Sequence, residues 1–171
     1  MNPPGRYGYE NGRLRVFDEH GPRTYGRPCE WAADCGPETF LGGPRGWTAA
    51  AREAIRVAET SPIRPVRGMP DDFIVFAAGL DGASPLAVCG IACEATTLTV
   101  RFEDVWALLP PSQRRFSYAC SAIRDPNGKD GLQPAADGMV RETLAGLAPD
   151  VRIAIDLADN GGFTLAFEPE P

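Results

Sequence analysis

The residues of this sequence that could carry covalent chemistry are its single histidine and two cysteines that follow it. His20 is the one side chain whose ordinary pKa suits general base work near pH 7, and Cys29 or Cys35 could be the thiol nucleophile, oriented through Asp18 or Asp34. Neither cysteine stands in a recognisable nucleophile signature, and a solvated loop histidine beside carboxylates explains the same residues. We assign no catalytic residue and keep a small thiol-dependent enzyme as an alternative.

The same three side chains could ligate a metal ion, with Glu30 or Asp34 as the fourth ligand. Zinc sites commonly place two to four residues between paired cysteines, whereas five separate Cys29 from Cys35. The sequence contains no Cys-x-x-Cys pair that would complete a site. We therefore predict no metal site and no cofactor, and we expect free thiols that are buried or half-buried.

Two loops have part of the pattern of a ligand-binding loop. Residues 42–46, Gly-Gly-Pro-Arg-Gly, precede an expected helix and could place backbone amides and Arg45 around an anion, but they lack the Gly-Lys-Ser/Thr of a phosphate-binding loop. Residues 125–131 suggest a calcium loop, yet Lys129 stands where an oxygen ligand is needed. Both are predicted to be turns.

The elements that would position these groups fall into an N-terminal arm, residues 1–47, and a body, residues 48–171. The arm holds nine glycines, six prolines and seven of the fifteen aromatic residues, without helical periodicity. Its clearest signal is Asn11-Gly12, which favours a two-residue hairpin turn. The expected register places Glu10 opposite Arg13, Tyr9 opposite Leu14 and Tyr7 opposite Val16.

The body is predicted from hydrophobic periodicity and from its capping and turn residues. Helices are expected over 48–59 and 134–147, a helical turn over 104–109, and strands over 73–79, 86–93, 97–103, 116–123, 151–158 and 163–168. The last two strands are expected to pair as a hairpin, with Leu157 opposite Phe163 and Arg152 opposite Glu168. Because the strands come in consecutive runs, we predict a single α+β domain with a largely antiparallel sheet of about five to six strands and two helices packed on one face.

Charge narrows the classes of partner. The formal net charge is −6 at pH 7, with +2 in residues 1–70 and −8 in residues 71–171. A net acidic chain lacks the surplus of Lys and Arg that nucleic-acid binding requires, and no stretch has the roughly 18 apolar residues of a membrane-spanning helix. The N-terminus lacks the apolar segment of a signal peptide, so we expect a cytoplasmic protein.

These observations favour a non-catalytic module that binds another, basic protein, for example an inhibitor or immunity-type protein. A strong bias to arginine over lysine suggests a bacterial or phage source, and a phage or bacterial assembly subunit that self-associates is a further alternative. The candidate binding residues are interface-type side chains of the arm and carboxylates of the body: Tyr7, Tyr9, Arg13, Arg15, Trp31, Arg45, Trp47, Asp156 and Glu168.

Overall fold

The computed structural model of the protein describes most of the body and three strands of the arm. It describes the backbone of residues 6–10, 13–18 and 21–25, and it describes residues 46–61, 63–69, 73–82, 84–92, 94–129 and 131–171. Among these residues, no helix has both the length and the apolar character needed to cross a membrane.

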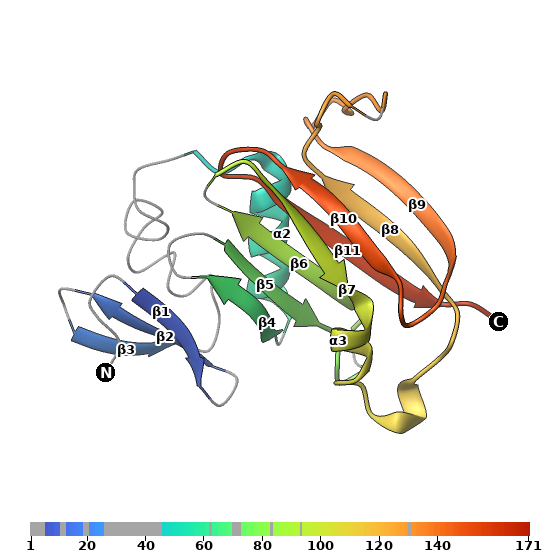
Figure 1. Cartoon of the computed structure of the whole chain (residues 1–171), viewed down its shortest axis with the longest axis horizontal. Coiled ribbons are helices and arrows are strands. Elements are labelled where there is room, and N and C mark those ends of the chain that lie inside the picture. The colour runs from blue at the N-terminus through green and yellow to red at the C-terminus, as the bar shows by residue number, and fades with distance from the viewer. Residues whose placement is uncertain are drawn as a thin grey trace.

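The centre of the body is a six-stranded antiparallel sheet (Figure 1). Its strands, in spatial order, are β4 (Ile63–Met69), β5 (Phe73–Ala78), β6 (Leu86–Ala92), β11 (Gly162–Pro169), β8 (Tyr118–Arg124) and β9 (Val140–Leu147). A helix, α2 (Ala49–Thr60), covers one face, and an antiparallel pair of strands, β7 (Thr96–Arg101) and β10 (Arg152–Leu157), covers the other. β5 and β6 lie inside this sheet and are buried almost throughout, as their continuous apolar runs predicted.

Helix α2 forms where the sequence predicted it. The Thr48 hydroxyl oxygen accepts a hydrogen bond from the Ala51 backbone N–H at 3.1 Å and so caps the first turn. Small side chains along its inner face allow the helix to lie close to the sheet. A Cβ on Gly162 would lie only 2.6 Å from the Ala51 Cα. The approach therefore requires glycine at the start of β11.

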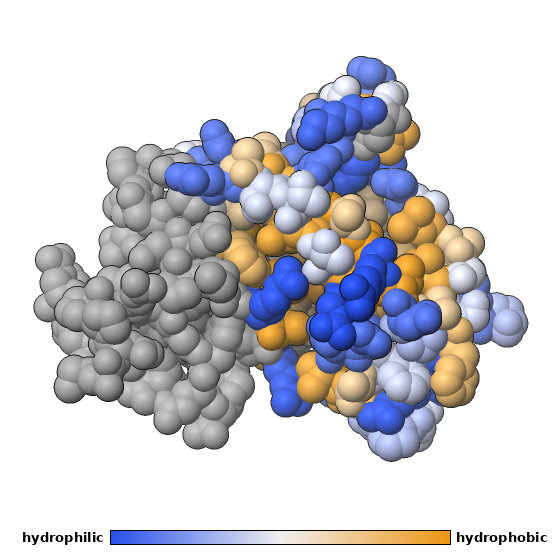
Figure 2. Space-filling view, in the orientation of Figure 1, coloured by the Kyte–Doolittle hydropathy of each residue, from blue (hydrophilic) through white to orange (hydrophobic). Residues whose placement is uncertain are grey.

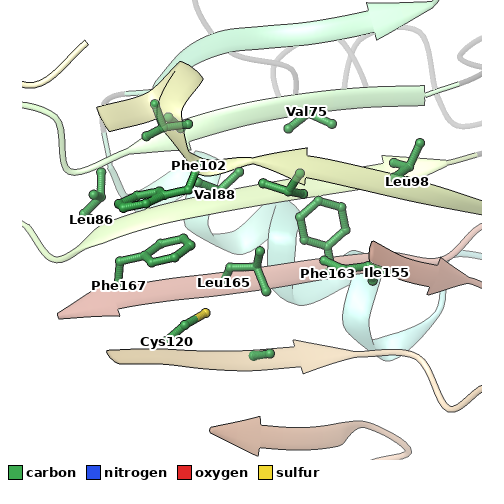
Figure 3. Packing of buried hydrophobic residues seen from close by; sticks show 14 of the residues in the cluster. Val75, Leu86, Val88, Leu98, Phe102, Cys120, Ile155, Phe163, Leu165 and Phe167 are labelled. Atoms are coloured by element: carbon green, nitrogen blue, oxygen red, sulfur yellow. The ribbon is translucent and has the colours of Figure 1, made fainter. Parts of the chain in front are cut away.

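The opposite face of the sheet holds the larger core, built around aromatic rings (Figure 3). Phe102 stacks on Phe167 with ring centroids 4.2 Å apart and meets the edge of Tyr118 at 5.0 Å. Phe102 begins a short helix, α3 (Phe102–Trp106), which continues directly from β7. This helix is therefore fixed to the core by its first residue.

The predicted class is confirmed: the described residues form a single α+β domain with a mostly antiparallel sheet and two helices, α2 and α3. The position of the second helix was wrong. Residues 140–147 form β9, preceded by a turn, and Gly138 and Gly146 have φ angles of 82° and 67°, which an α-helix does not accept. Val140 and Leu144 satisfy both a helical and a strand period, and pairing with β8 decides between them. The two helices consequently pack on opposite faces of the sheet.

The predicted terminal hairpin was also wrong. Arg152 lies opposite Arg101 in β7, and Glu168 lies opposite Ala119 in β8. The turn after β10 carries the chain from the two-stranded layer into the six-stranded sheet, and its left-handed residue is Asn160, with φ 54°.

The arm contains a separate three-stranded sheet of β1 (Arg6–Glu10), β2 (Arg13–Asp18) and β3 (Gly21–Tyr25). The predicted hairpin register is confirmed, with Glu10 opposite Arg13. β3, which the sequence did not predict, extends this hairpin by pairing with β2.

Candidate functional site

Several residues predicted to carry function lie outside the described residues. These are His20, Cys29, Cys35, Trp31 and Arg45, so the alternative thiol site has no geometry to compare. Of the remaining arm residues, the described backbone places Tyr7 and Tyr9 in β1 and places Arg13 and Arg15 in β2.

The other three predicted binding residues lie apart from one another. Trp47 is half-buried and packs against the apolar cluster beneath α2. Asp156, in β10, accepts hydrogen bonds from the Thr97 hydroxyl at 2.5 Å and the Asn127 side-chain amide at 3.1 Å. Glu168 is exposed near the end of β11. The structure therefore does not join Asp156 and Glu168 into one site.

Glu168 borders a hollow of the described surface, a cavity of about 580 Å³. Its walls are the turn between β5 and β6, the segment from Leu109 to Tyr118, and the end of β11. The volume falls within the roughly 300–1,000 Å³ of small-ligand pockets. Leu86, Leu109 and Phe167 line it with apolar surface, and polar residues, glycines and prolines supply the rest.

The loop of residues 110–117, with a short 3₁₀ turn, η2 (Pro111–Gln113), forms one wall of the cavity. The Tyr118 hydroxyl oxygen accepts a hydrogen bond from the Arg115 backbone N–H at 2.9 Å, and the Arg115 carbonyl accepts one from the Trp106 indole N–H at 2.7 Å. Tyr118 is buried and belongs to the aromatic core. The loop is thus fastened to the core at Arg115.

This loop presents an exposed aromatic ring. Phe116 is 76% exposed and its ring centroid lies 5.7 Å from that of Trp106. The Arg114 guanidinium carbon lies 5.0 Å from the Trp106 ring centroid, a cation–π distance. We call these three residues, Trp106, Arg114 and Phe116, the Phe116 surface.

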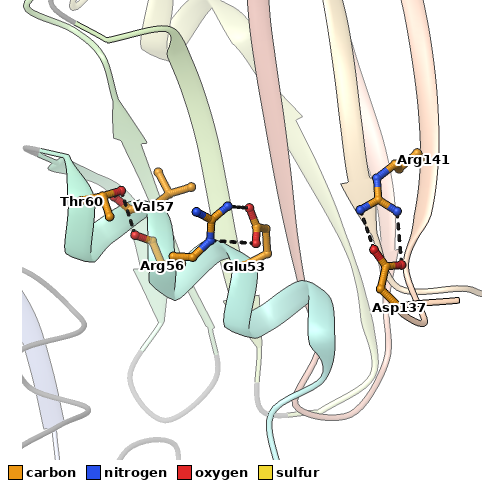
Figure 4. Close-up of polar contacts among 6 residues, drawn as sticks. All are labelled: Glu53, Arg56, Val57, Thr60, Asp137 and Arg141. Atoms are coloured by element: carbon orange, nitrogen blue, oxygen red, sulfur yellow. Dashed lines mark hydrogen bonds and ion pairs between the residues drawn. The ribbon is translucent and has the colours of Figure 1, made fainter. Parts of the chain in front are cut away.

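Charge around the loop differs from that of the chain as a whole. Residues 105–124 contain three arginines and no Asp or Glu, in a protein of net charge −6. Some acidic side chains elsewhere form local ion pairs: Glu53 pairs with Arg56 and Asp137 with Arg141 (Figure 4). Figure 2 shows that hydrophilic residues also gather over β7 and the start of α3, where Arg101 pairs with Glu103.

The structure describes two cysteines, Cys89 and Cys120, neither of which the sequence analysis proposed as a nucleophile. Cys89 and Cys120 are free and buried in β6 and β8, and burial raises the pKa of each thiol to about 12. A thiol that stays protonated at neutral pH is a poor nucleophile. Within the described ranges, no group of three or more His, Cys, Asp or Glu side chains could hold a metal ion.

Sequence reasoning missed the Phe116 surface. It assigned Phe116 to a strand over 116–123, whereas β8 begins at Tyr118. The available signal was compositional: Trp106, Arg114, Arg115 and Phe116 are interface-enriched types that occur close together around Pro110-Pro111.

Comparisons with known proteins return similarity to parts of larger enzymes. No protein-family model matches the chain, and no curated protein sequence matches it. A glycoside hydrolase family 97 enzyme from Pseudoalteromonas sp. strain K8, in complex with acarbose, is 16% identical over 64% of this chain and 16% of that one, with a TM-score of 0.46. α-Galactosidase I from Mortierella vinacea is 17% identical over 68% of this chain and 25% of that one, with a TM-score of 0.39. The chain thus spans a quarter or less of the length of these enzymes.

Proposed function

We propose that this protein is a non-catalytic module that binds another protein, and that the Phe116 surface is its main contact. The observation that carries the proposal is the exposure of Phe116 on a loop fastened to the core. Covering a phenylalanine side chain removes apolar area from water and contributes roughly 1.5–3 kcal/mol. Because the loop is already ordered, a partner gains this contact at a low entropic cost.

The neighbours of Phe116 support the same function. Tryptophan and arginine are enriched among the residues that dominate binding energies, and here Arg114 lies over Trp106 beside the exposed ring. Arg114 also donates hydrogen bonds to the carbonyls of Leu109 and Ala107 at 3.0 and 2.9 Å. Its position is therefore set before a partner arrives.

A basic partner, of the kind an acidic inhibitor or immunity-type protein binds, fits the net charge of −6 and the exposed carboxylate of Glu168. Glu168 is exposed, and its side chain makes no hydrogen bond or ion pair with the described part of the chain. It borders the same cavity as Arg115, the residue preceding Phe116. A cationic group of the partner could meet Glu168 while its apolar surface covers Phe116.

The proposal is tested by affinity capture with matched baits and quantitative mass spectrometry. Wild-type protein, Phe116→Ser and the control Leu132→Ser are immobilised; Leu132 is the other exposed large apolar residue of the described surface. We expect a protein that wild type and Leu132→Ser retain and Phe116→Ser loses at least fivefold, with retention falling as salt rises. If every retained protein is held equally by all three baits, the Phe116 surface is not an interface.

A further inference from the structure

We propose that the cavity lined by Glu168 and by Arg115, the residue preceding Phe116, receives a lysine or arginine side chain of the protein partner. This inference rests on the proposed function and names the chemistry that the partner must present. It is carried by the distribution of apolar and charged groups around the cavity and by the way its walls are held.

The apolar part of the cavity suits the stem of a long cationic side chain. Leu86, Leu109 and Phe167 line it and are themselves buried, so they are held in place by the core. Lysine and arginine pack their methylene stems along apolar surface while the charged head stays near water. A short or purely polar side chain would leave this apolar lining uncovered.

The charged groups of the lining favour a cationic head. Two exposed acidic residues, Asp81 and Glu168, and one arginine, Arg115, line the cavity. The Arg115 Nη1 donates to the carbonyls of Ser112 and Arg114 at 3.0 and 2.9 Å, so this nitrogen is occupied by its own loop. Glu168 has no such partner among the described residues and is available to an incoming ammonium or guanidinium.

The walls of the cavity hold one shape. Gly79 has a φ of 78°, and a Cβ there would lie 2.2 Å from the Pro85 carbonyl oxygen, so the turn between β5 and β6 requires glycine. The Gln113 side-chain amide reaches the Asp81 carbonyl at 3.5 Å and lies 3.0 Å from where a Cβ of Gly82 would be. The turn and the loop of residues 110–117 therefore touch, and the cavity between them does not have to be formed by the partner.

The experiment uses blocked amino acids as probes in ¹H–¹⁵N NMR titrations of the full chain at low salt. The probes are the N-acetyl methylamides of lysine, arginine, glutamate and leucine. We expect the lysine and arginine probes to shift the amide signals of Gly79, Gly82 and Leu86 saturably, with dissociation constants in the millimolar range, and the other two probes to leave them unshifted.

Matched variants test whether the cationic probe contacts the Glu168 carboxylate. Glu168→Gln is expected to weaken binding of the lysine probe about 1.4-fold to fivefold, the range of one exposed ion pair. Glu94→Gln removes the same charge from an exposed residue beyond the opposite end of β6 and is expected to change nothing. Spectra of both variants without probe show whether the fold is retained.

Two results would overturn the inference: binding of the glutamate probe at this cavity, abolished by Arg115→Gln, or no saturable shift with either cationic probe. Its failure is distinct from failure of the proposed function. A partner lost by Phe116→Ser but held normally by Glu168→Gln would leave the Phe116 surface as the interface and remove the cavity. Cationic probes that bind while no partner depends on Phe116 would remove the proposed function instead.

Discussion

The carboxylate of Asp125, just after β8, accepts a hydrogen bond from the backbone N–H of Gly162, the first residue of β11, at 2.9 Å in the buried interior. The same oxygen, Oδ2, lies only 2.1 Å from where a Cβ on Gly161 would be. Asp125 therefore holds the point at which the chain crosses from the two-stranded layer to the six-stranded sheet, and glycine is required beside it.

Asp125→Ala should destabilise the protein, because it leaves the buried Gly162 N–H without an acceptor. The expected loss is about 1–3 kcal/mol in the free energy of unfolding, measured by urea denaturation. Asp150→Ala, which removes an exposed carboxylate without a partner in the described chain, should change stability by less than about 0.5 kcal/mol. Equal losses in the two variants would show that the Asp125 contact is not a stabilising one.

Asp156 should make folding stability depend on pH in the acid range. The hydrogen bond from Thr97, with smaller effects of Lys129, Asn127 and Arg124, lowers the pKa of this carboxyl. A lowered pKa in the folded state contributes stability that is fully present above the unfolded pKa of about 3.9 and is lost as pH falls through the folded value.

The measurement compares unfolding of wild type and Asp156→Asn by urea between about pH 2.5 and 6. Wild type should be the more stable protein above about pH 4, and the difference should shrink as pH falls below it. A difference that stays constant across this range would mean that the effect of the substitution is not one of titration.

The thiols of Cys89 and Cys120 should be inert in the folded protein. Burial raises the pKa of both to about 12, so almost no thiolate is present at pH 8. Iodoacetamide, with peptide mapping by mass spectrometry, should modify these two positions only after denaturant is added. Rapid modification of either thiol without denaturant would show that its strand opens readily or that the thiol is accessible.

The sequence predicted local features well and long-range neighbours poorly, for identifiable reasons. Thr48 marked the start of α2 because a capping hydroxyl acts within one turn, and Asn11-Gly12 predicted the β1–β2 register because that turn links adjacent residues. The alternation of residues 151–158 indicates which side chains share a face, but it carries no information on which strand lies alongside. In the structure β10 pairs with β7 rather than with β11. The two residues in contact there, Thr97 and Asp156, are 59 residues apart in the sequence.

The candidate site shows the same limit. Glu168 was predicted to be a binding residue and lies at the cavity, but the other walls come from segments around Gly82 and Arg115 that only the folded sheet brings together. The exposure of Phe116 depends on where β8 begins, and apolar alternation placed that start two residues too early. Exposure of a single aromatic ring cannot be derived from its neighbours in sequence.

Deleting the three-stranded sheet of the arm should leave the body folded, because β1, β2 and β3 pair only with one another among the described strands, although β1 and β2 lie against β4. The deletion should end after Tyr25, since one that ends at residue 19 would leave β3 without its partner β2. The shortened protein is expected to melt in one cooperative transition within about 4 °C of wild type, as followed by circular dichroism.

The shortened protein should also keep any partner that depends on Phe116, whereas a partner lost with the arm would assign a second contact to Tyr7, Tyr9, Arg13 or Arg15. If the cooperative transition disappears, the arm sheet is part of the core and its predicted role as an interface is wrong.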